Sequence, residues 1–187
     1  MWIVVGLGNP GEKYGSTRHN LGFSFISRLV EKLDFPRGNL VFSMNKKLNA
    51  KLVKTDIYGD ELILAKPQSF MNKSGEAVKK ILDYFNEGSD KLIVVSDDSN
   101  LEIGKARVRK DGESGGHKGL ESIISAIGPV FWRVRIGIGS PDRTALESYV
   151  LEKIPEVEKK LIEKTIDKVV EKMISYLSRG NIENITI

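Results

Sequence analysis

The sequence contains no cysteine, and this absence removes several kinds of chemistry at once. Disulfide bonds, thiolate nucleophiles and cysteine-ligated zinc or iron–sulfur sites are all excluded. A chain without cysteine also fits a reducing compartment, so we expect a cytoplasmic protein. No apolar run approaches the roughly 20 residues that a helix needs to span a bilayer, and we therefore expect no membrane partner.

The first residues lack the features of a signal peptide. The segment MWIVVGLGNPGEKYG has no basic region at its start, and a glycine-rich loop follows the first five residues. The composition, 40% apolar and 29% charged, is typical of one soluble globular domain spanning residues 1–187. The net charge of +4 permits a polyanionic partner such as RNA, although a lysine-rich, well-solvated surface explains the same balance.

The pattern of apolar residues predicts an α/β fold. Strands are expected at residues 2–5, 47–53, 61–65, 92–95, 105–110 and 133–138. Apolar residues at helical spacing predict helices at residues 21–33, 76–85, 120–127 and 155–180. The apolar stripe of the last helix is expected to contain Val157, Leu161, Ile166, Val169, Val170, Met173 and Leu177. Strands interleaved with helices indicate a sheet that is covered by helices on both faces.

Polar residues follow the predicted strands at the points where each strand ends. Asn9 and His19 come after the first strand, Asn72 follows residues 61–65, and Asp97 follows residues 92–95. In α/β sheets, ligands bind where strands end and loops begin. The sequence therefore predicts that these polar loops converge on one pocket.

Three glycine-rich motifs match the patterns of known sites, but the residues around each motif do not fit that kind of site. Gly6 to Gly11 matches GxGxxG, but Pro10 and Gly11 prevent the helix that must open on those glycines to bind a pyrophosphate. Residues 112–116 match the GxSxG nucleophile elbow, yet His117 follows Ser114 too closely to be the late histidine of that fold. The same loop departs from a P-loop at two positions.

Proton transfer near neutral pH is best served by imidazole, and the chain has only two histidines, His19 and His117. His19 lies in a loop beside a strand end, and Asp97 could accept one of its N–H groups and leave the other nitrogen free as a base. Such a set activates water and needs no serine nucleophile. A metal site built from His19, His117 and Asp97 is conceivable, but no sequence pattern supports it, and we expect none.

Five sequence blocks resemble the signature blocks of bacterial-type peptidyl-tRNA hydrolases, in order and spacing over essentially the whole chain. They are IVVGLGNPGEKYGSTRHNLGF, KPQSFMNKSGEAV, VVSDD, a loop ending SGGHKGLESI, and FWRVRIGIGSP. The resemblance implies a three-layer α/β/α sandwich around a mixed twisted sheet, acting as a monomer without a cofactor. It also implies hydrolysis of the ester that joins a peptide to the terminal adenosine ribose of tRNA.

The same resemblance implies roles for individual residues. His19 would activate water, Asp97 would stabilise its basic form, and Asn9 would sense the peptide amide. Asn72 would bind the peptide main chain, with Tyr14 and Phe70 near the tRNA end. Arg109 and Arg135 would hold tRNA phosphate, with a half-exposed, solvated strand face as the competing explanation for both.

Lys118 departs from the family pattern, which often has asparagine at this place. Lysine donates hydrogen bonds and cannot accept them, so Lys118 is a candidate contact for tRNA or substrate but not for a role that needs an acceptor.

The alternative to an enzyme is a non-catalytic RNA-binding protein on the same fold. The two differ in whether His19, Asp97, Asn9 and Asn72 are all present, and all four are.

Overall fold

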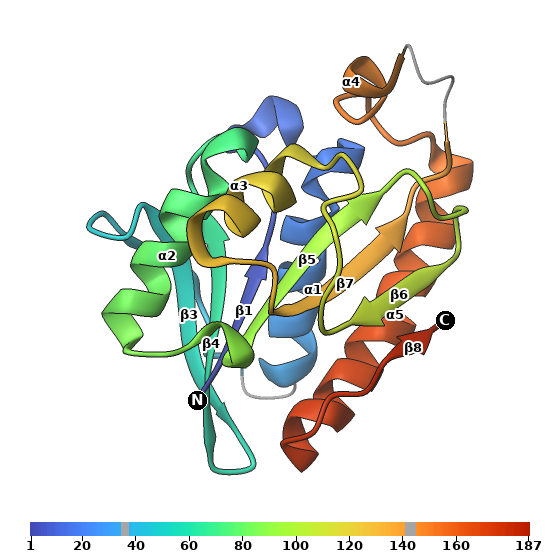
Figure 1. Ribbon diagram of the computed structural model, residues 1–187. Helices are drawn as coiled ribbons and strands as arrows, with labels where there is room; N and C mark the ends of the chain where they lie inside the picture. Colours follow the sequence, from blue (N-terminus) through green and yellow to red (C-terminus); the bar gives the residue numbers. More distant parts are fainter. Residues whose placement is uncertain (35–37, 141–144) are drawn as a thin grey trace.

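A mixed sheet runs through the centre of the protein. The computed structural model describes residues 1–34, 38–140 and 145–187; Pro141, at the end of one signature block, lies outside these ranges. In the described chain the sheet has the strand order β2-β3-β4-β1-β5-β7-β6-β8 (Figure 1). The strands are β1 (Trp2–Gly6), β2 (Ser43–Asn45), β3 (Ala50–Ile57), β4 (Asp60–Pro67), β5 (Leu92–Asp98), β6 (Ala106–Arg109), β7 (Trp132–Gly137) and β8 (Ile185–Thr186).

The central strands of this sheet are parallel and the outer ones are antiparallel. β1 pairs in parallel with β4 and β5, and β5 pairs in parallel with β7. β3, β6 and the short edge strands β2 and β8 run antiparallel to their neighbours. The carboxyl ends of β4, β1, β5 and β7 consequently lie along one edge, where the sequence placed its polar loops.

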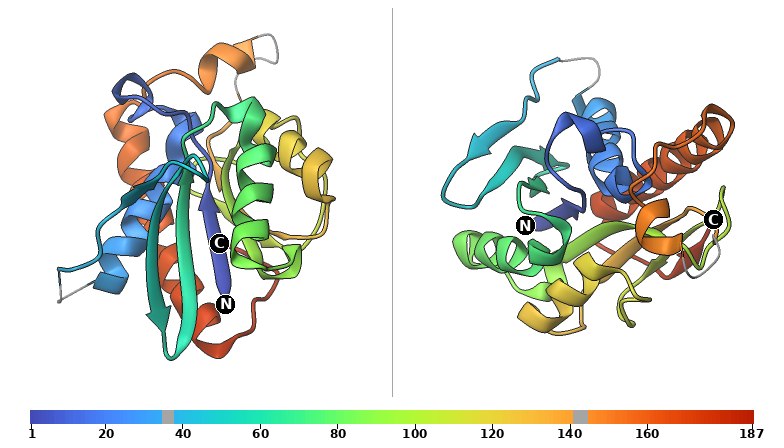
Figure 2. Two further views of the ribbon diagram at one scale, coloured as in Figure 1. Left: turned by 90° about the vertical axis from the view of Figure 1, so that its left-hand side faces the viewer. Right: turned by 90° about the horizontal axis from the view of Figure 1, so that it is seen from above.

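Helices cover both faces of the sheet, as the two views of Figure 2 show. They are α1 (Leu21–Asp34) and α5 (Glu156–Arg179) on one face, and α2 (Ser74–Phe85) and α3 (Lys118–Ile127) on the other. The short helix α4 (Leu146–Tyr149) lies beyond the ends of the strands (Figure 1). Val4 belongs to the core that α1 and α5 cover, whereas Ile3 and Val5 belong to the core under α2 and α3. Alternate side chains of a strand therefore enter opposite cores. The predicted α/β/α sandwich around a mixed sheet is confirmed.

The edges of the sheet differ from the sequence prediction. The strand expected at residues 47–53 begins only at Ala50, because Asn49 has a positive φ of 48° and closes a turn after β2. The turn predicted at residues 58–60 is confirmed: Tyr58 and Gly59 both have positive φ and join β3 to β4. The strands β2 and β8 carry too few residues for a periodic pattern to reveal them.

The long tail helix begins and ends as predicted, but its apolar stripe was partly wrong. Pro155 precedes α5, and Gly180 ends it with a φ of 65°. Val157 is 85% exposed and Leu161 is 46% exposed, so neither enters the core. Residues three or four positions apart lie on the same side of a helix, so the side that contains the buried Ile162 also contains Glu158 and not Val157. Glu158 binds the buried Arg18.

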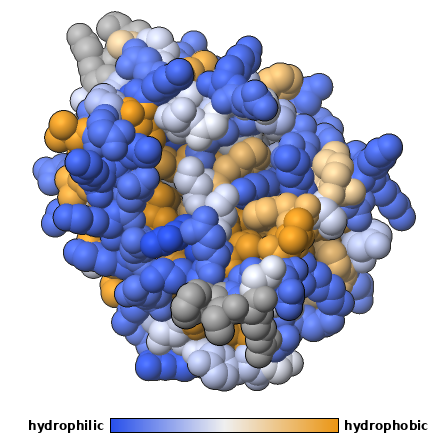
Figure 3. Space-filling model, turned by 180° about the vertical axis from the view of Figure 1, so that it is seen from behind, coloured by the Kyte–Doolittle hydropathy of each residue, from blue (hydrophilic) through white to orange (hydrophobic). Residues whose placement is uncertain are grey.

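The outer surface of the α1 and α5 layer is mostly hydrophilic, with apolar side chains visible in patches (Figure 3). This matches two amphipathic helices whose apolar sides face the sheet. Among the described residues, no helix has both the length and the apolar character that crossing a membrane demands.

Candidate active site

A cavity of about 490 Å³ opens at the carboxyl edge of the parallel strands. Its lining includes Asn9, His19, Asn72 and Asp97, so the predicted convergence of four polar loops on one pocket is confirmed. Phe70 and Lys118 also line this cavity, whereas Tyr14, Arg109 and Arg135 are absent from its lining. The remaining lining residues are Met71, Asp98, Ser99, Ser114, Gly115, Gly116, His117, Leu146, Glu147, Val150 and Leu151.

Two backbone features bring His19 to the end of β5. Gly6 and Gly22 let the end of β1 approach the start of α1 closely, since a Cβ on Gly6 would lie 2.2 Å from the carbonyl oxygen of Gly22. His19 lies in a short 3₁₀ turn, Arg18–Asn20, directly before α1. Its backbone N–H donates to the carbonyl oxygen of Val150 at 2.8 Å, which fixes the turn.

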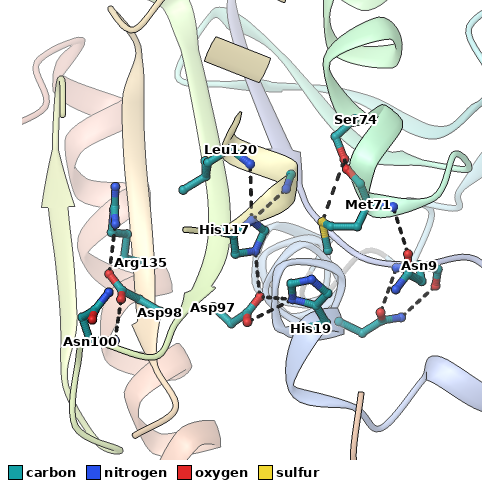
Figure 4. A network of polar contacts seen from close by, with 12 residues as sticks. Asn9, His19, Met71, Ser74, Asp97, Asp98, Asn100, His117, Leu120 and Arg135 are labelled. Atoms are coloured by element: carbon teal, nitrogen blue, oxygen red, sulfur yellow. Dashed lines mark hydrogen bonds and ion pairs between the residues drawn. The ribbon is translucent and has the colours of Figure 1, made fainter. Parts of the chain in front are cut away.

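Asp97, near the end of β5, lies between the two histidines of the chain (Figure 4). Its Oδ1 is 3.0 Å from Nδ1 of His19 and 3.0 Å from Nε2 of His117, and its Oδ2 is 3.1 Å from His19 Nδ1. Burial alone would raise the pKa of the Asp97 carboxyl, but the imidazoles of His117 and His19 more than offset this and hold the pKa well below its usual range. Asp97 is therefore an ionised acceptor, and both rings donate to it.

His117 has a fixed tautomer, because it also caps a helix. Its Nδ1 accepts hydrogen bonds from the backbone N–H groups of Gly119 at 3.1 Å and Leu120 at 3.3 Å. That nitrogen cannot carry a proton, so Nε2 carries it and donates to Asp97. No sequence motif had indicated a role for His117. The available signal was its place directly before a predicted helix, where a capping side chain belongs.

The structure brings together the three residues considered for a metal site, with one ligand atom from each within 4.8 Å of the others. A cation at their centre would need the lone pair of His117 Nε2. That nitrogen is protonated as long as Nδ1 accepts from the helix, and a metal would therefore have to disrupt the helix cap. The donor set fits a hydrogen-bonded cluster better than a metal centre.

Asn9 lies beside this cluster, with its side-chain oxygen already occupied. The backbone N–H of Met71 donates to Asn9 Oδ1 at 3.0 Å. Asn20 binds the backbone of Asn9 on both sides, accepting from its N–H at 2.8 Å and donating to its carbonyl oxygen at 3.0 Å. These bonds orient the side chain so that its NH₂ group is free to donate to a ligand.

Arg18 ties residues 146–154 to the loop that carries His19. Its guanidinium stacks on the ring of Tyr149 at 3.9 Å and binds Glu158 at 2.7 Å. Ile154 donates its N–H to the carbonyl oxygen of Ser16 at 3.0 Å. The segment with Val150 is thereby held over one side of the cavity.

A face of four arginines lies next to the cavity on β6 and β7. The antiparallel register places Arg107 opposite Arg135 and Arg109 opposite Arg133, so all four side chains point to one side of the sheet. Arg135 binds Asp98 at 3.1 Å and the carbonyl oxygen of Glu113, and both contacts lie beside the cavity lining. We call these four residues the arginine face.

The members of the arginine face differ in how many hydrogen bonds their guanidinium groups already make within the protein. Arg133 is completely buried and binds three backbone carbonyl groups. Arg109 donates to the carbonyl oxygens of Val108 and Ile185 and to Thr186. Arg107, which no sequence motif singled out, is exposed, and its guanidinium makes no hydrogen bond to any described residue.

Two of the other candidate residues, Phe70 and Asn72, lie at the outer part of the cavity, whereas Tyr14 lies outside its lining. Phe70 is 57% exposed, Asn72 is exposed, and Tyr14 is partly exposed beside Lys13. The hydroxyl of Ser114 donates to Glu121 at 3.3 Å and makes no hydrogen bond to either histidine ring among the described residues, which agrees with rejecting a serine nucleophile.

Comparison with known proteins gives a consistent result. The family model described as "Peptidyl-tRNA hydrolase" matches residues 3–186. The peptidyl-tRNA hydrolase of Thermoanaerobacter sp. (strain X514) is 41% identical over 181 residues, which is 96% of this chain and 95% of that protein. The peptidyl-tRNA hydrolase of Shouchella clausii (strain KSM-K16) is 40% identical over 185 residues, covering 98% and 97%.

A solved structure also matches closely. The crystal structure of peptidyl-tRNA hydrolase from Acinetobacter baumannii superposes with a TM-score of 0.89 at 32% sequence identity. The match covers 96% of this chain and 89% of that one.

Proposed function

Because the chain belongs to the peptidyl-tRNA hydrolase family, which hydrolyses the ester between peptide and tRNA, we propose that His19 is the general base of this reaction. The observation that carries the proposal is the orientation of His19 by Asp97. Nδ1–H of His19 donates to the carboxylate, which leaves Nε2 without a partner among the described residues and unprotonated. Nε2 is therefore free to accept a proton from water in the cavity.

The reaction follows from this arrangement. Water loses a proton to His19 as it attacks the ester carbonyl, and the ionised Asp97 stabilises the imidazolium that forms. The imidazolium then returns the proton to the ribose oxygen as the ester bond breaks. The NH₂ group of Asn9 donates to a carbonyl of the substrate. Water, a base and amide donors supply every group that the chemistry needs, so no cofactor takes part.

We assign recognition of the peptide to the residues around this cluster. Asn9 contacts the peptide amide, and Asn72, on the next loop, binds the main chain of the peptide. Phe70 and Tyr14 offer aromatic faces on which the terminal bases of tRNA can stack.

We further propose that the enzyme acts as a monomer in the cytoplasm; the chain's lack of cysteine fits that compartment.

The arginine face supplies the contacts to tRNA phosphate. Arg109 and Arg135 remain the residues proposed from the resemblance, and Arg107 joins them because its guanidinium is exposed and uncommitted. Arg133 is buried and bound to backbone carbonyl groups, so it is not proposed as a phosphate contact.

Replacing Arg107, Arg109 or Arg135 with alanine should weaken tRNA binding and flatten its salt dependence. Each lost phosphate contact reduces the log–log slope of affinity against salt by about 0.7–0.9. Kd is measured for a tRNA between low and high salt. Arg28→Ala is the matched control, because Arg28 is occupied by Asp167 on the α1–α5 side. Unchanged slopes in all three variants would assign these arginines to an ordinary solvated surface.

The proposed recognition of the peptide amide is tested with two substrates that differ only at the amino group. The protein should release N-acetyl-aminoacyl groups from tRNA quickly and leave free aminoacyl-tRNA nearly intact, because the free ammonium replaces the amide that Asn9 binds. Deacylation rates are compared at equal substrate concentration. Equal rates would remove Asn9 from amide recognition, and no cleavage of either substrate would favour the non-catalytic RNA-binding alternative.

A further inference from the structure

Lys118 and Glu147 form an ion pair at the mouth of the cavity. The distance from Lys118 Nζ to Glu147 Oε1 is 2.6 Å, and both residues line the cavity. Lys118 is the first residue of α3, whereas Glu147 lies in α4, so the pair connects two elements on opposite sides of the opening. The lysine that departs from the family pattern is thus already bound by a carboxylate of its own chain.

The hydrogen bonding of the pair is exclusive, although the carboxylate of Glu121 also attracts Lys118 electrostatically. Among the described residues, neither the ammonium of Lys118 nor the carboxylate of Glu147 has a further hydrogen-bond partner. The two side chains are 59% and 84% exposed, so water and a ligand reach both. Ion pairs exposed to this extent contribute little to stability and exchange partners easily.

The start of α3 does not provide a second anion site beside Lys118. The N–H groups of Gly119 and Leu120 are taken by the side chain of His117. An anion that reaches this rim must therefore bind the ammonium of Lys118 itself, and it must displace the carboxylate of Glu147 to do so.

We propose that Glu147 holds Lys118 in the free enzyme and gives it up to a backbone phosphate of the bound tRNA. This inference rests on the proposed function, because it assumes that tRNA enters at this mouth. An approaching polyanion attracts Lys118 and repels Glu147, so both effects separate the pair. Separating the pair costs free energy, so Glu147 lowers the affinity for a ligand that brings a phosphate to Lys118, whereas a ligand without phosphate leaves the pair intact.

The exchange involves side chains and leaves the backbone of the site in place. Val150 continues to accept from the N–H of His19, and Tyr149 continues to stack on Arg18. Glu147 is therefore expected to affect the binding of the substrate and not its cleavage. The Kd of a substrate that cannot be cleaved measures this effect directly. Failure of the His19 mechanism would leave this measurement unaffected, so the two proposals can fail separately.

The test measures Kd for an N-acetylaminoacyl-tRNA whose ester is replaced by an amide. Glu147→Gln should lower Kd by about two- to fivefold at low salt, a range set by the small contribution of exposed ion pairs. The gain should fade as salt rises from about 10 mM to about 1 M, because the phosphate contact is screened. Lys118→Met should raise Kd, and adding Glu147→Gln to it should bring a clearly smaller gain, because only the repulsion between Glu147 and the polyanion is then relieved.

Glu61→Gln is the matched control for net charge. Glu61 forms an exposed ion pair with Lys54, also at 2.6 Å, on the β3–β4 hairpin away from the cavity. This variant removes the same charge and should leave Kd unchanged. An equal gain in Glu61→Gln, or a gain from Glu147→Gln that is undiminished in the Lys118→Met background, would overturn the exchange.

A ligand without phosphate identifies what replaces Glu147. The amide-linked N-acetylaminoacyl-adenosine presents the peptide, ribose and base only. Glu147→Gln should leave its Kd unchanged. A gain of the same size with this ligand would show that Lys118 binds the peptide or the nucleoside, and the phosphate assignment would be wrong.

Discussion

Replacing His19 with alanine is expected to lower kcat by roughly 10²–10⁴-fold, the usual contribution of a positioned general base. The loss follows from removing the only imidazole whose free nitrogen faces the cavity, since both nitrogens of His117 are committed. Binding of tRNA should barely change, because the arginine face makes no contact with His19. Single-turnover cleavage of N-acetyl-aminoacyl-tRNA measures the rate, and Kd for an uncleavable analogue measures the binding.

Two further variants separate the loss of the base from a disturbance of the site. His19→Asn keeps an N–H donor toward Asp97 but has no basic nitrogen, so it should be as inactive as the alanine variant and closer to the native stability. Ser114→Ala should retain most of the activity, since the Ser114 hydroxyl binds Glu121 and not a histidine. Near-normal turnover by His19→Asn would contradict the proposed mechanism, and inactivation by Ser114→Ala would restore the serine nucleophile.

The parts of the fold that could be predicted depend on local patterns. Helix α1 was located from the spacing of residues such as Phe25 and Leu29, which are fully buried. The pocket was predicted because the ends of parallel strands share one edge, and this needs only the strand positions and their order. Asn9, His19 and Asp97 could each be placed in it before any contact was known.

The parts that could not be predicted depend on contacts between distant segments. The pairing of β8 with β6 and the binding of Arg109 to Thr186 join residues about 80 positions apart in the chain, and no local pattern encodes them. The same holds for Glu147, which meets Lys118 across 29 positions. His117 was missed for a different reason: its function depends on which of its nitrogens the helix backbone occupies, and that is a property of the folded loop.

Replacing Asp97 with asparagine should lower kcat by a similar factor, roughly 10²–10⁴-fold, through the tautomer of His19. His117 has a fixed N–H pointing at Oδ1, so the new amide must present its oxygen there. Its NH₂ group then takes the place of Oδ2, which lies 3.1 Å from His19 Nδ1. The oxygen that stays at the place of Oδ1 lies 3.0 Å from the same nitrogen, but as a neutral amide oxygen it already accepts from His117 and is a weaker acceptor than the carboxylate. A donor at that place favours the tautomer with the proton on Nε2, and His19 can no longer act as a base.

The same carboxylate should affect folding in a pH-dependent way. The pKa of Asp97 is lower in the folded protein than the value of about 3.9 that an unfolded chain has. Ionised Asp97 therefore stabilises the fold at pH above about 4, and this contribution is lost as the pH falls below it. Chemical unfolding of wild-type protein and Asp97→Asn at several pH values should give free energies of unfolding that converge in acid. A difference that stays constant down to pH 2 would show that Asp97 is not held in its ionised form.

A double variant tests whether His117 sets the orientation of the amide. In Asp97→Asn combined with His117→Ala, the amide is free to turn its oxygen toward His19 and restore the active tautomer. The double variant should therefore be faster than Asp97→Asn alone, although it has lost a second active-site side chain. His117→Ala removes a helix cap at a cost of about 0.5–2 kcal/mol, so thermal unfolding must show that the variants are folded at the assay temperature. The double variant could instead be slower than Asp97→Asn, with a decrease in kcat equal to the product of the decreases in the two single variants. His117 would then contribute to catalysis independently of Asp97, and the tautomer of His19 would not depend on how the helix holds His117.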